Sequence, residues 1–225
     1  MERTLQNSNW NVNYNSSMGS LERPIHDITP NRRGVRAREA VLDAAERLIA
    51  QHGYDAATIA ALVEEDGVPP SSIYHYFGSK RGVLLAAIER GAERFFRELP
   101  APNGRSGSER EYLRSLVDTV AAALLRHPDF PRIVVVLAAQ PARPGNGEIE
   151  RVVGAVRELA LRRLRREMQV AFGMDPGGPA ADRLARFALA ALAGAVIFDR
   201  SHSALAPGDV LADLPAALVA ARRQM

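Results

Sequence analysis

Helical periodicity, interrupted at intervals by glycine and proline, is the feature that most limits what this chain can fold into. From residue 33 onward, apolar side chains recur three and four positions apart, as they do on one face of an α-helix. Glycine ends several of these runs, at Gly53, Gly67 and Gly173. The β-branched run at 133–136 has the composition of a strand, but no neighbouring segment has the pattern of a partner strand. We therefore expect an all-α fold of nine helices.

The composition excludes several other classes of protein. The chain has 225 residues and no cysteine, so it has no disulfide, thiolate metal site or redox switch, which is typical of reducing compartments. Its longest nearly uncharged apolar stretch, Phe187 to Phe198, is much shorter than the ~20 residues that a membrane span needs. The N-terminus lacks the basic-then-apolar layout of a signal peptide. We expect a cytoplasmic chain that does not enter a membrane.

Changes in composition divide the chain into three parts. Residues 1–30 contain the polar run QNSNWNVNYNSS and show no sustained period, so we expect a disordered N-terminal arm. A true start at Met18 is an alternative. Residues 31–78 are expected to form a small domain, and residues 79–225 a linking helix followed, after Pro100, by a larger helical domain.

Two short helices separated by a glycine-containing turn are expected within residues 31–78. Thr58 is placed to cap a helix that ends at Gly67. Pro69 and Pro70 suit the first turn of the next helix, where a missing N–H costs little. This arrangement is the signature of a helix-turn-helix.

The second short helix has one apolar side and two polar sides. Ile73 and Phe77 share a face because they are four residues apart, and we expect them to pack on the preceding helices. Hydroxyl and imidazole groups on the other sides could reach base edges and phosphates in a major groove. These polar sides carry Ser71 with His75, and Ser72 with Tyr76.

Residues 67–80, GVPPSSIYHYFGSK, preceded by TIAALVEED, resemble the DNA-binding domain of the TetR family of transcriptional regulators. The resemblance is close over residues 33–85 and weak beyond them. It implies a three-helix helix-turn-helix DNA-binding domain, joined by a linking helix to a helical-bundle domain for ligand binding and dimerisation. Two chains would then bind a palindromic double-stranded DNA operator. The chain departs from the family at Asp66, Pro69 and Ser71, which puts the operator sequence in doubt.

Family positions and local electrostatics select the DNA contacts. Tyr74 matches the phosphate-contacting tyrosine of the family, and Lys80, the single lysine of the chain, matches a phosphate position. Lys80 also falls in the first turn of a helix, where the macrodipole disfavours a cation unless an anion such as phosphate compensates it. Core packing is the alternative for Tyr74 and Tyr76, and a solvated helix start is the alternative for the arginines within 32–38. The expected contacts are Arg33, Arg36, Thr58, Ser71, Ser72, Tyr74, His75, Tyr76 and Lys80.

Catalytic and metal-binding patterns are missing from the sequence. The five histidines do not form a metal-ligand spacing. The chain also lacks a phosphate loop, a dinucleotide fingerprint and a GxSxG motif. We expect no catalytic residues, no metal, no cofactor and no enzymatic activity.

The last two expected helices are candidates for self-association. Small residues recur at four-residue spacing in FALAALAGAVIF, as at Ala190 and Gly194, so another helix can approach closely. The last helix offers Leu211, Leu214 and Leu218. The resemblance implies that these two helices form a homodimer as a four-helix bundle. The alternative is that residues 187–198 are the buried centre of a monomer.

The resemblance also implies a small-molecule pocket in the C-terminal domain. His127, Asp199 and His202 are its possible polar groups, and each of the apolar candidates could instead be an ordinary core residue. The arginines within 162–166 are interpreted as a solvated helix face. The expected pocket residues are Tyr112, Leu116, Val120, Val136, Gln140, Val156, Phe187, Ala191 and Phe198.

These features together predict a ligand-responsive transcriptional regulator. The expected mechanism is a repressor that releases its operator when a small-molecule effector of unknown identity tilts the linking helix. Two other hypotheses remain: a helical small-molecule-binding protein or enzyme with a vestigial helix-turn-helix, and an interaction protein that binds another regulator through its last helices.

Overall fold

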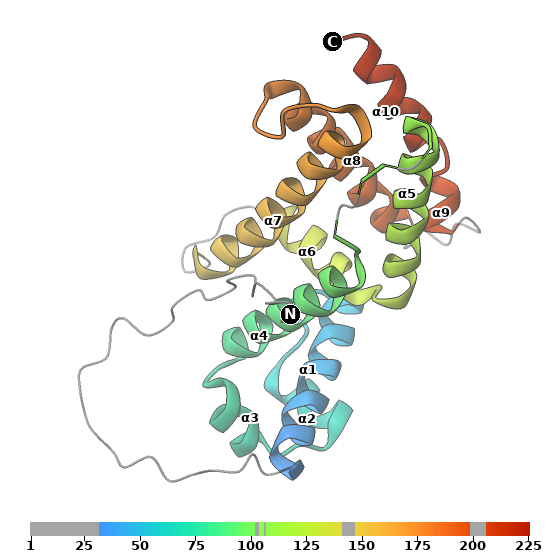
Figure 1. Ribbon diagram of the computed structural model, residues 1–225. Helices are drawn as coiled ribbons and strands as arrows, with labels where there is room; N and C mark the ends of the chain where they lie inside the picture. Colours follow the sequence, from blue (N-terminus) through green and yellow to red (C-terminus); the bar gives the residue numbers. More distant parts are fainter. Residues whose placement is uncertain (1–31, 102–103, 106, 141–146, 199–205) are drawn as a thin grey trace, which may run out of the picture.

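The computed structural model describes residues 32–101, 104–105, 107–140, 147–198 and 206–225. The N-terminal arm expected at residues 1–30 lies outside these ranges, as do Asp199 and His202. The described residues form ten helices and no strand, which confirms the all-α prediction (Figure 1). The run at 133–136 is helical, so the helix interpretation of that segment is also confirmed.

Four helices form the N-terminal part of the molecule, and local signals fix where they begin and end. Thr58 Oγ1 accepts a hydrogen bond from the Ala61 amide, and Gly67 adopts a left-handed φ of 68° that closes the second helix. Ser79 Oγ caps the fourth helix by accepting from the Gly82 amide. The helices are α1 (Arg32–His52), α2 (Ile59–Asp66), α3 (Pro70–Phe77) and α4 (Lys80–Glu98).

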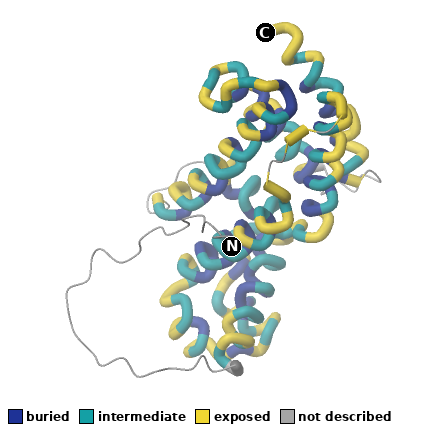
Figure 2. Tube along the Cα trace, in the orientation of Figure 1, coloured by how far each residue is buried: buried dark blue, intermediate teal, exposed yellow. Residues whose placement is uncertain are grey.

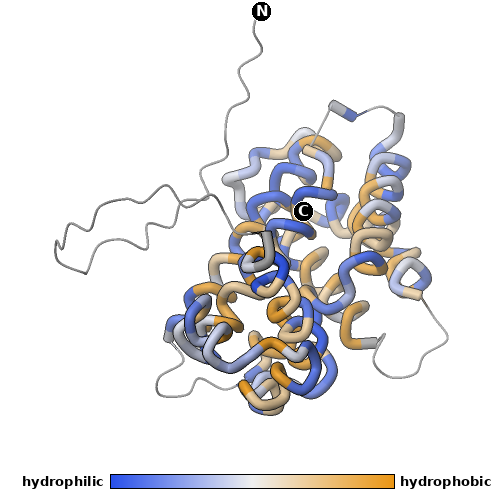
Figure 3. The backbone as a smooth tube through the Cα atoms, turned by 90° about the horizontal axis from the view of Figure 1, so that it is seen from below, coloured by the Kyte–Doolittle hydropathy of each residue, from blue (hydrophilic) through white to orange (hydrophobic). Residues whose placement is uncertain are grey.

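Six helices form the C-terminal part. The antiparallel pair α7 and α8 is connected by a short turn, while α10 packs against α5 and α8. In Figures 2 and 3, buried and hydrophobic residues alternate with exposed and hydrophilic ones along each helix, as amphipathic packing requires. The helices are α5 (Glu109–Arg126), α6 (Asp129–Ala138), α7 (Gly147–Phe172), α8 (Pro179–Phe198), α9 (Pro207–Val210) and α10 (Leu214–Arg223).

The end of the chain differs from the prediction of one final helix. Pro215 is the second residue of α10, and its ring would clash with the carbonyl of Leu211 if α9 continued without a break. The segment is therefore two helices. Asp209 lies inside α9, where its carboxylate accepts a hydrogen bond from the Ala206 amide.

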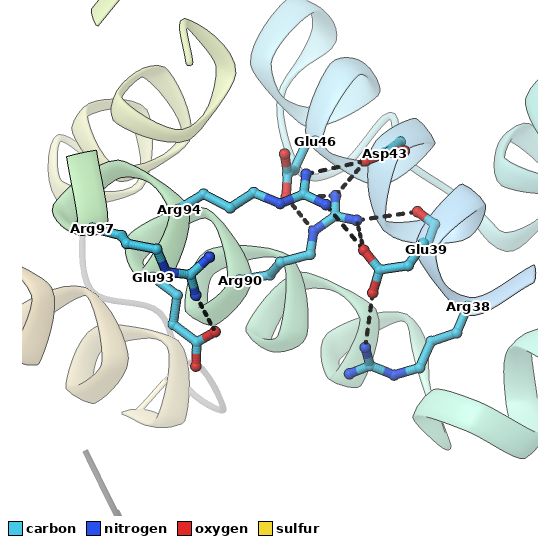
Figure 4. A network of polar contacts seen from close by, with 8 residues as sticks. All are labelled: Arg38, Glu39, Asp43, Glu46, Arg90, Glu93, Arg94 and Arg97. Atoms are coloured by element: carbon cyan, nitrogen blue, oxygen red, sulfur yellow. Dashed lines mark hydrogen bonds and ion pairs between the residues drawn. The ribbon is translucent and has the colours of Figure 1, made fainter. Parts of the chain in front are cut away.

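An ion-pair network joins α1 to α4 (Figure 4). The Arg90 side chain, 10% exposed, lies 2.8 Å from Glu39, 2.8 Å from Asp43 and 2.7 Å from Glu46. Arg94 adds contacts to two of these carboxylates, Glu39 and Asp43. The network fixes α1, on which α2 packs, to α4, on which α3 packs.

Helix α6 lies at the junction between the two parts of the molecule. It packs on α1 and α4 on one side and on α7 and α8 on the other. Gly91 of α4 touches the ring of Phe130 so closely that an added Cβ would lie 2.6 to 2.9 Å from its atoms. Glycine is therefore required where α4 crosses α6.

Candidate nucleic-acid interface and ligand cavity

Helix α3 turns its polar side away from the protein, as predicted. Ile73 is fully buried, and Phe77 packs against the core. This packing leaves Ser71, His75 and Tyr74 exposed, with Tyr74 52% accessible. Helices α2 and α3 lie at the end of the molecule farthest from the C-terminus (Figure 1), so nothing among the described residues covers this side.

Two other α3 candidates are only partly accessible. Ser72 and Tyr76 are half-buried. The Tyr76 ring packs edge-on against His75 at 5.2 Å and against Phe77 at 6.3 Å between ring centroids. Tyr76 therefore both supports the helix and keeps part of its surface in the solvent.

Lys80 has partners within the protein, which the sequence argument did not foresee. Its Nζ donates a hydrogen bond to the Asp55 carbonyl at 2.9 Å and lies 4.4 Å from the centroid of the Tyr54 ring. A carbonyl dipole and an aromatic face stabilise the ammonium group, so the premise that phosphate must compensate it is wrong. Lys80 stays partly accessible, and it links the start of α4 to the turn after α1.

The remaining candidates lie at helix starts. Thr58 is exposed at the N-terminus of α2, where unpaired amides favour an anion. Arg36 is exposed in the first turns of α1. Arg33 belongs to α1, but its side chain lies outside the described part of the chain.

The acidic end of α2 is partly compensated by an arginine of α1. Arg47 lies 3.3 Å from Glu65 and 3.8 Å from Asp66. Burial raises the pKa of Asp66, and Arg47 opposes that shift. The four-residue spacing of Asp43 and Arg47 on α1 predicts a pair, and this prediction is wrong. Arg47 pairs with Glu65 of α2, and Asp43 pairs with Arg90 and Arg94 of α4.

A cavity of about 440 Å³ lies in the C-terminal part and is lined by residues of α4, α5, α6, α7 and α8. Its walls are mainly apolar. Phe95 and Phe96 of α4 and Phe130 of α6 pack together at one wall, with ring centroids 5.5 to 6.4 Å apart. The volume and the apolar lining are those of a small-molecule site.

Charged groups on α7 also face this cavity. Glu167 is 7% exposed and accepts a hydrogen bond from the Tyr112 hydroxyl at 2.5 Å; burial raises the pKa of both groups. The half-buried Arg163 lies 5.4 Å above the Phe96 ring and donates to the Leu99 carbonyl at 3.3 Å. Burial lowers the pKa of Arg163. The interpretation of this arginine as a solvated residue is wrong.

Some of the predicted pocket residues line the cavity and others do not, depending on how each helix is rotated about its axis. Leu116, Val120 and Val156 line the cavity, and Tyr112 contacts its Glu167. On α6 and α8 the cavity-facing residues are instead Val134, Val135, Leu189, Ala190 and Val196, because the inward faces lie a residue or more away from those expected. Those outside the lining are Val136, Gln140, Phe187 and Ala191, with Phe187 exposed. The side chain of Phe198 is outside the described part.

His127 does not reach the cavity either. Its Nε2 lies 2.5 Å from Glu98, which also accepts from Arg126 at 2.6 Å, on the surface where α4 and α5 meet. These partners lower the pKa of the Glu98 carboxyl. Across the described ranges, no three His, Cys, Asp or Glu side chains come together to hold a metal ion. None of the helices in those ranges is long and apolar enough to cross a membrane.

The fold and the exposed α3 define the class of protein: a helix-turn-helix protein with an all-helical C-terminal part. Residues 41–87 match the family model described as "Bacterial regulatory proteins, tetR family". The resemblance to the DNA-binding domain of the TetR family is thus confirmed over these residues.

Comparison with individual proteins also finds helix-turn-helix transcriptional regulators. The HTH-type transcriptional regulator BetI of Brucella anthropi is 34% identical over 80 residues, which are 36% of this chain and 41% of that protein. This chain thus matches about two fifths of the length of that relative.

Solved structures extend the likeness in fold to the C-terminal part. A TetR-family regulator from Agrobacterium tumefaciens has a TM-score of 0.67 at 18% identity, covering 83% of this chain and 98% of that one. SmeT, the repressor of a Stenotrophomonas maltophilia multidrug efflux pump, has a TM-score of 0.60 at 22% identity, covering 81% and 89%. These similar proteins are described as regulators, not enzymes, in agreement with the expectation for this chain.

Proposed function

We propose that the protein is a ligand-responsive DNA-binding transcriptional regulator, and specifically a repressor that releases a palindromic operator when a small molecule enters the C-terminal cavity. The observation that carries the proposal is the exposed side of α3, held outward by the buried Ile73. The description of SmeT as a repressor supports this direction of regulation. Such a regulator acts in the cytoplasm, where the DNA is.

The proposed division of labour follows the sequence boundaries. Residues 31–78 would bind DNA, and residues 79–225 would link, bind the effector and dimerise. The proposed DNA contacts are Arg33, Arg36, Thr58, Ser71, Ser72, Tyr74, His75, Tyr76 and Lys80, of which Ser71, Tyr74 and His75 are the exposed members on α3.

Helix α4 connects the proposed DNA-binding part to the proposed ligand cavity. Its C-terminal half contributes Phe95 and Phe96 to the cavity, and its middle holds α1 through Arg90. A ligand that displaces Phe130 would therefore push on α4 at Gly91 and move the helix-turn-helix with it. The required coupling is a free-energy difference of about 1–3 kcal/mol between the two states.

Dimerisation through α8 and α10 is the second part of the proposal. Helix α8 presents Phe187 and Ile197 to solvent, 44% and 55% exposed, and α10 packs beside it. Both exposed side chains lie on α8, whereas Leu214 and Leu218 of α10 are buried within the chain. Exposed apolar side chains of this size favour burial against a second copy of the chain. A two-fold dimer would place its α3 helices in successive major grooves, about 34–36 Å apart.

Fluorescence anisotropy with DNA from upstream of the gene tests the proposal. We expect nanomolar-class binding to one fragment, much weaker binding to a shuffled fragment, and a loss of affinity as salt rises. Equal affinity for both fragments would contradict a sequence-specific regulator.

Two substitutions separate the proposed roles in the same assay. His75→Ala removes a group aimed at base edges, so we expect a changed preference among operator variants, with a loss of about 1–3 kcal/mol at the affected base pair. Lys80→Ala removes a charge, so we expect weaker binding on every fragment and a shallower salt dependence. The opposite pattern would reverse the two assignments.

A further inference from the structure

A guanidinium group that forms no ion pair among the described residues lies on the wall of the cavity. Arg163 is half-buried, and the hydrogen bond that it forms there is the long one to the Leu99 carbonyl. Glu167, one turn along α7, raises the pKa of Arg163 electrostatically, but its carboxylate is engaged by Tyr112 and does not pair with the guanidinium. An arginine has five N–H donors in a planar fork that matches a carboxylate. A desolvated cation with unused donors is a ready site for an anion.

The other charges of the cavity leave this excess of positive charge in place. Arg157 and Arg186 also line it; Arg186 is engaged by Asp182 at 2.6 Å, whereas Arg157 has no ion pair within the described ranges. The single acidic group of the lining, Glu167, already accepts from Tyr112. With Arg186 paired to Asp182, the guanidinium groups of Arg157 and Arg163 remain against the single carboxylate of Glu167.

The rest of the cavity wall is apolar and therefore favours a ligand with an apolar body. Leu116 and Val120 of α5 and Leu189 and Val196 of α8 line the cavity together with the phenylalanine cluster of α4 and α6. A ligand that fills this space gains from burial of hydrocarbon, at about 25 cal/mol per Å².

We propose that the effector is an amphipathic carboxylate, with its apolar body in the cavity and its carboxylate bound by Arg163, an inference that rests on the proposed function. The fork of Arg163 would form two charge-assisted hydrogen bonds to the two carboxylate oxygens. Arg157, exposed beside the cavity, would attract the anion as it approaches. The guanidinium group lies over the Phe96 ring, with Cζ 5.4 Å from the ring centroid.

A lipophilic cation bound by Glu167 is the competing occupant. It would have to displace the Tyr112 hydroxyl or share the carboxylate with it, in a wall that carries three arginines. The charge balance favours the anion.

Titration calorimetry on the full-length protein tests the assignment with three probes of equal chain length: dodecanoate, dodecanol and dodecyltrimethylammonium, each below its micelle concentration. We expect dodecanoate to bind most tightly. Arg163→Gln should weaken dodecanoate by at least about tenfold and leave dodecanol unchanged, since it removes only the charged contact. Arg163→Lys should give an intermediate loss, because it keeps the charge without the fork.

Arg162→Gln is the matched control. Arg162 neighbours Arg163 on α7, but it is exposed, pairs with Glu158 at 3.9 Å and is not part of the cavity wall. We expect no change in dodecanoate affinity. Glu167→Gln should keep or tighten dodecanoate binding, whereas it would abolish binding of a cation.

Several results would overturn the assignment: tighter binding of dodecyltrimethylammonium, equal losses for Arg162→Gln and Arg163→Gln, or no binding of dodecanoate. Fluorescence anisotropy with upstream DNA, measured in parallel, distinguishes failure of the effector assignment from failure of the proposed regulator function. Specific DNA binding without dodecanoate binding would refute the effector class and leave the regulator standing. Dodecanoate binding without specific DNA binding would refute the regulator, and with it the assignment of this ligand as an effector.

Discussion

Arg90→Ala should lower the free energy of unfolding by about 3 kcal/mol, because it leaves the carboxylates of Glu39, Asp43 and Glu46 close together without their main counter-charge. Glu46 is affected most, since burial already raises its pKa and Arg90 is the group that opposes the shift. For a chain of this size the loss corresponds to a fall in Tm of roughly 6–12 °C. Thermal unfolding followed by circular dichroism measures it.

Arg97→Ala is the matched control on the same helix. The Arg97 side chain is 73% exposed and has one ion pair, at 4.0 Å to Glu93. Such a pair contributes no more than about 1 kcal/mol, so Tm should barely change. Equal shifts in the two variants would contradict the structural role given to the α1–α4 network. We also expect Arg90→Ala to weaken DNA binding, because Arg90 fixes α1, on which α2 packs, to α4, on which α3 packs.

Gly91→Ala should be destabilising although it places the better helix former on a helix. The added methyl would lie 2.6 to 2.9 Å from Cβ, Cγ and Cδ2 of Phe130, so α4 and α6 must move apart or the ring must turn. Overpacking of this kind costs about 1–3 kcal/mol. Because Phe130 lines the cavity, the affinity for cavity ligands should change as well. Unfolding curves and ligand titration measure the two effects.

Gly154→Ala is the matched control, because no side chain lies where the added methyl group would go. An added Cβ at Gly154 of α7 meets nothing within 4 Å, so alanine should stabilise the helix by about 0.5–1 kcal/mol. Opposite signs at the two glycines would support the close crossing of α4 and α6. A stabilising Gly91→Ala would contradict it.

Features determined by neighbours along the chain could be predicted from the sequence. The caps at Thr58 and Ser79, the left-handed Gly67, and the capping box of Ser108 with Glu111 depend on residues within four positions, and all are present. The exposed and buried sides of α3 follow from the same short-range periodicity.

Features determined by distant helices could not be predicted in this way. Asp43 pairs with arginines of α4 about fifty positions away instead of with Arg47, since the packing of α4 decides which charges meet. The sequence pointed to residues 136 and 140 as pocket residues, whereas Val134 and Val135 line the cavity. Packing against the other helices fixes the rotation of α6 about its axis, so this rotation cannot be predicted from the sequence of α6 alone.

Arg163 and Glu167 are the functional candidates that the sequence analysis missed. A signal was present: counted from Val156, already a pocket candidate, positions 160, 163 and 167 follow at helical spacing and share its face. The cluster of arginines around Arg163 obscured this pattern, because a charge run is usually a solvated face.

The central claim is that two copies of α3 read DNA from its major groove. Dimethyl sulfate protection of guanine N7, an atom of that groove, tests it on the operator fragment. We predict protection in two clusters, one helical turn apart, that disappears in a Ser71→Ala/His75→Ala variant with unchanged thermal stability. Bound DNA with uniform or absent N7 protection, or clusters that persist in the double variant, would contradict the claim.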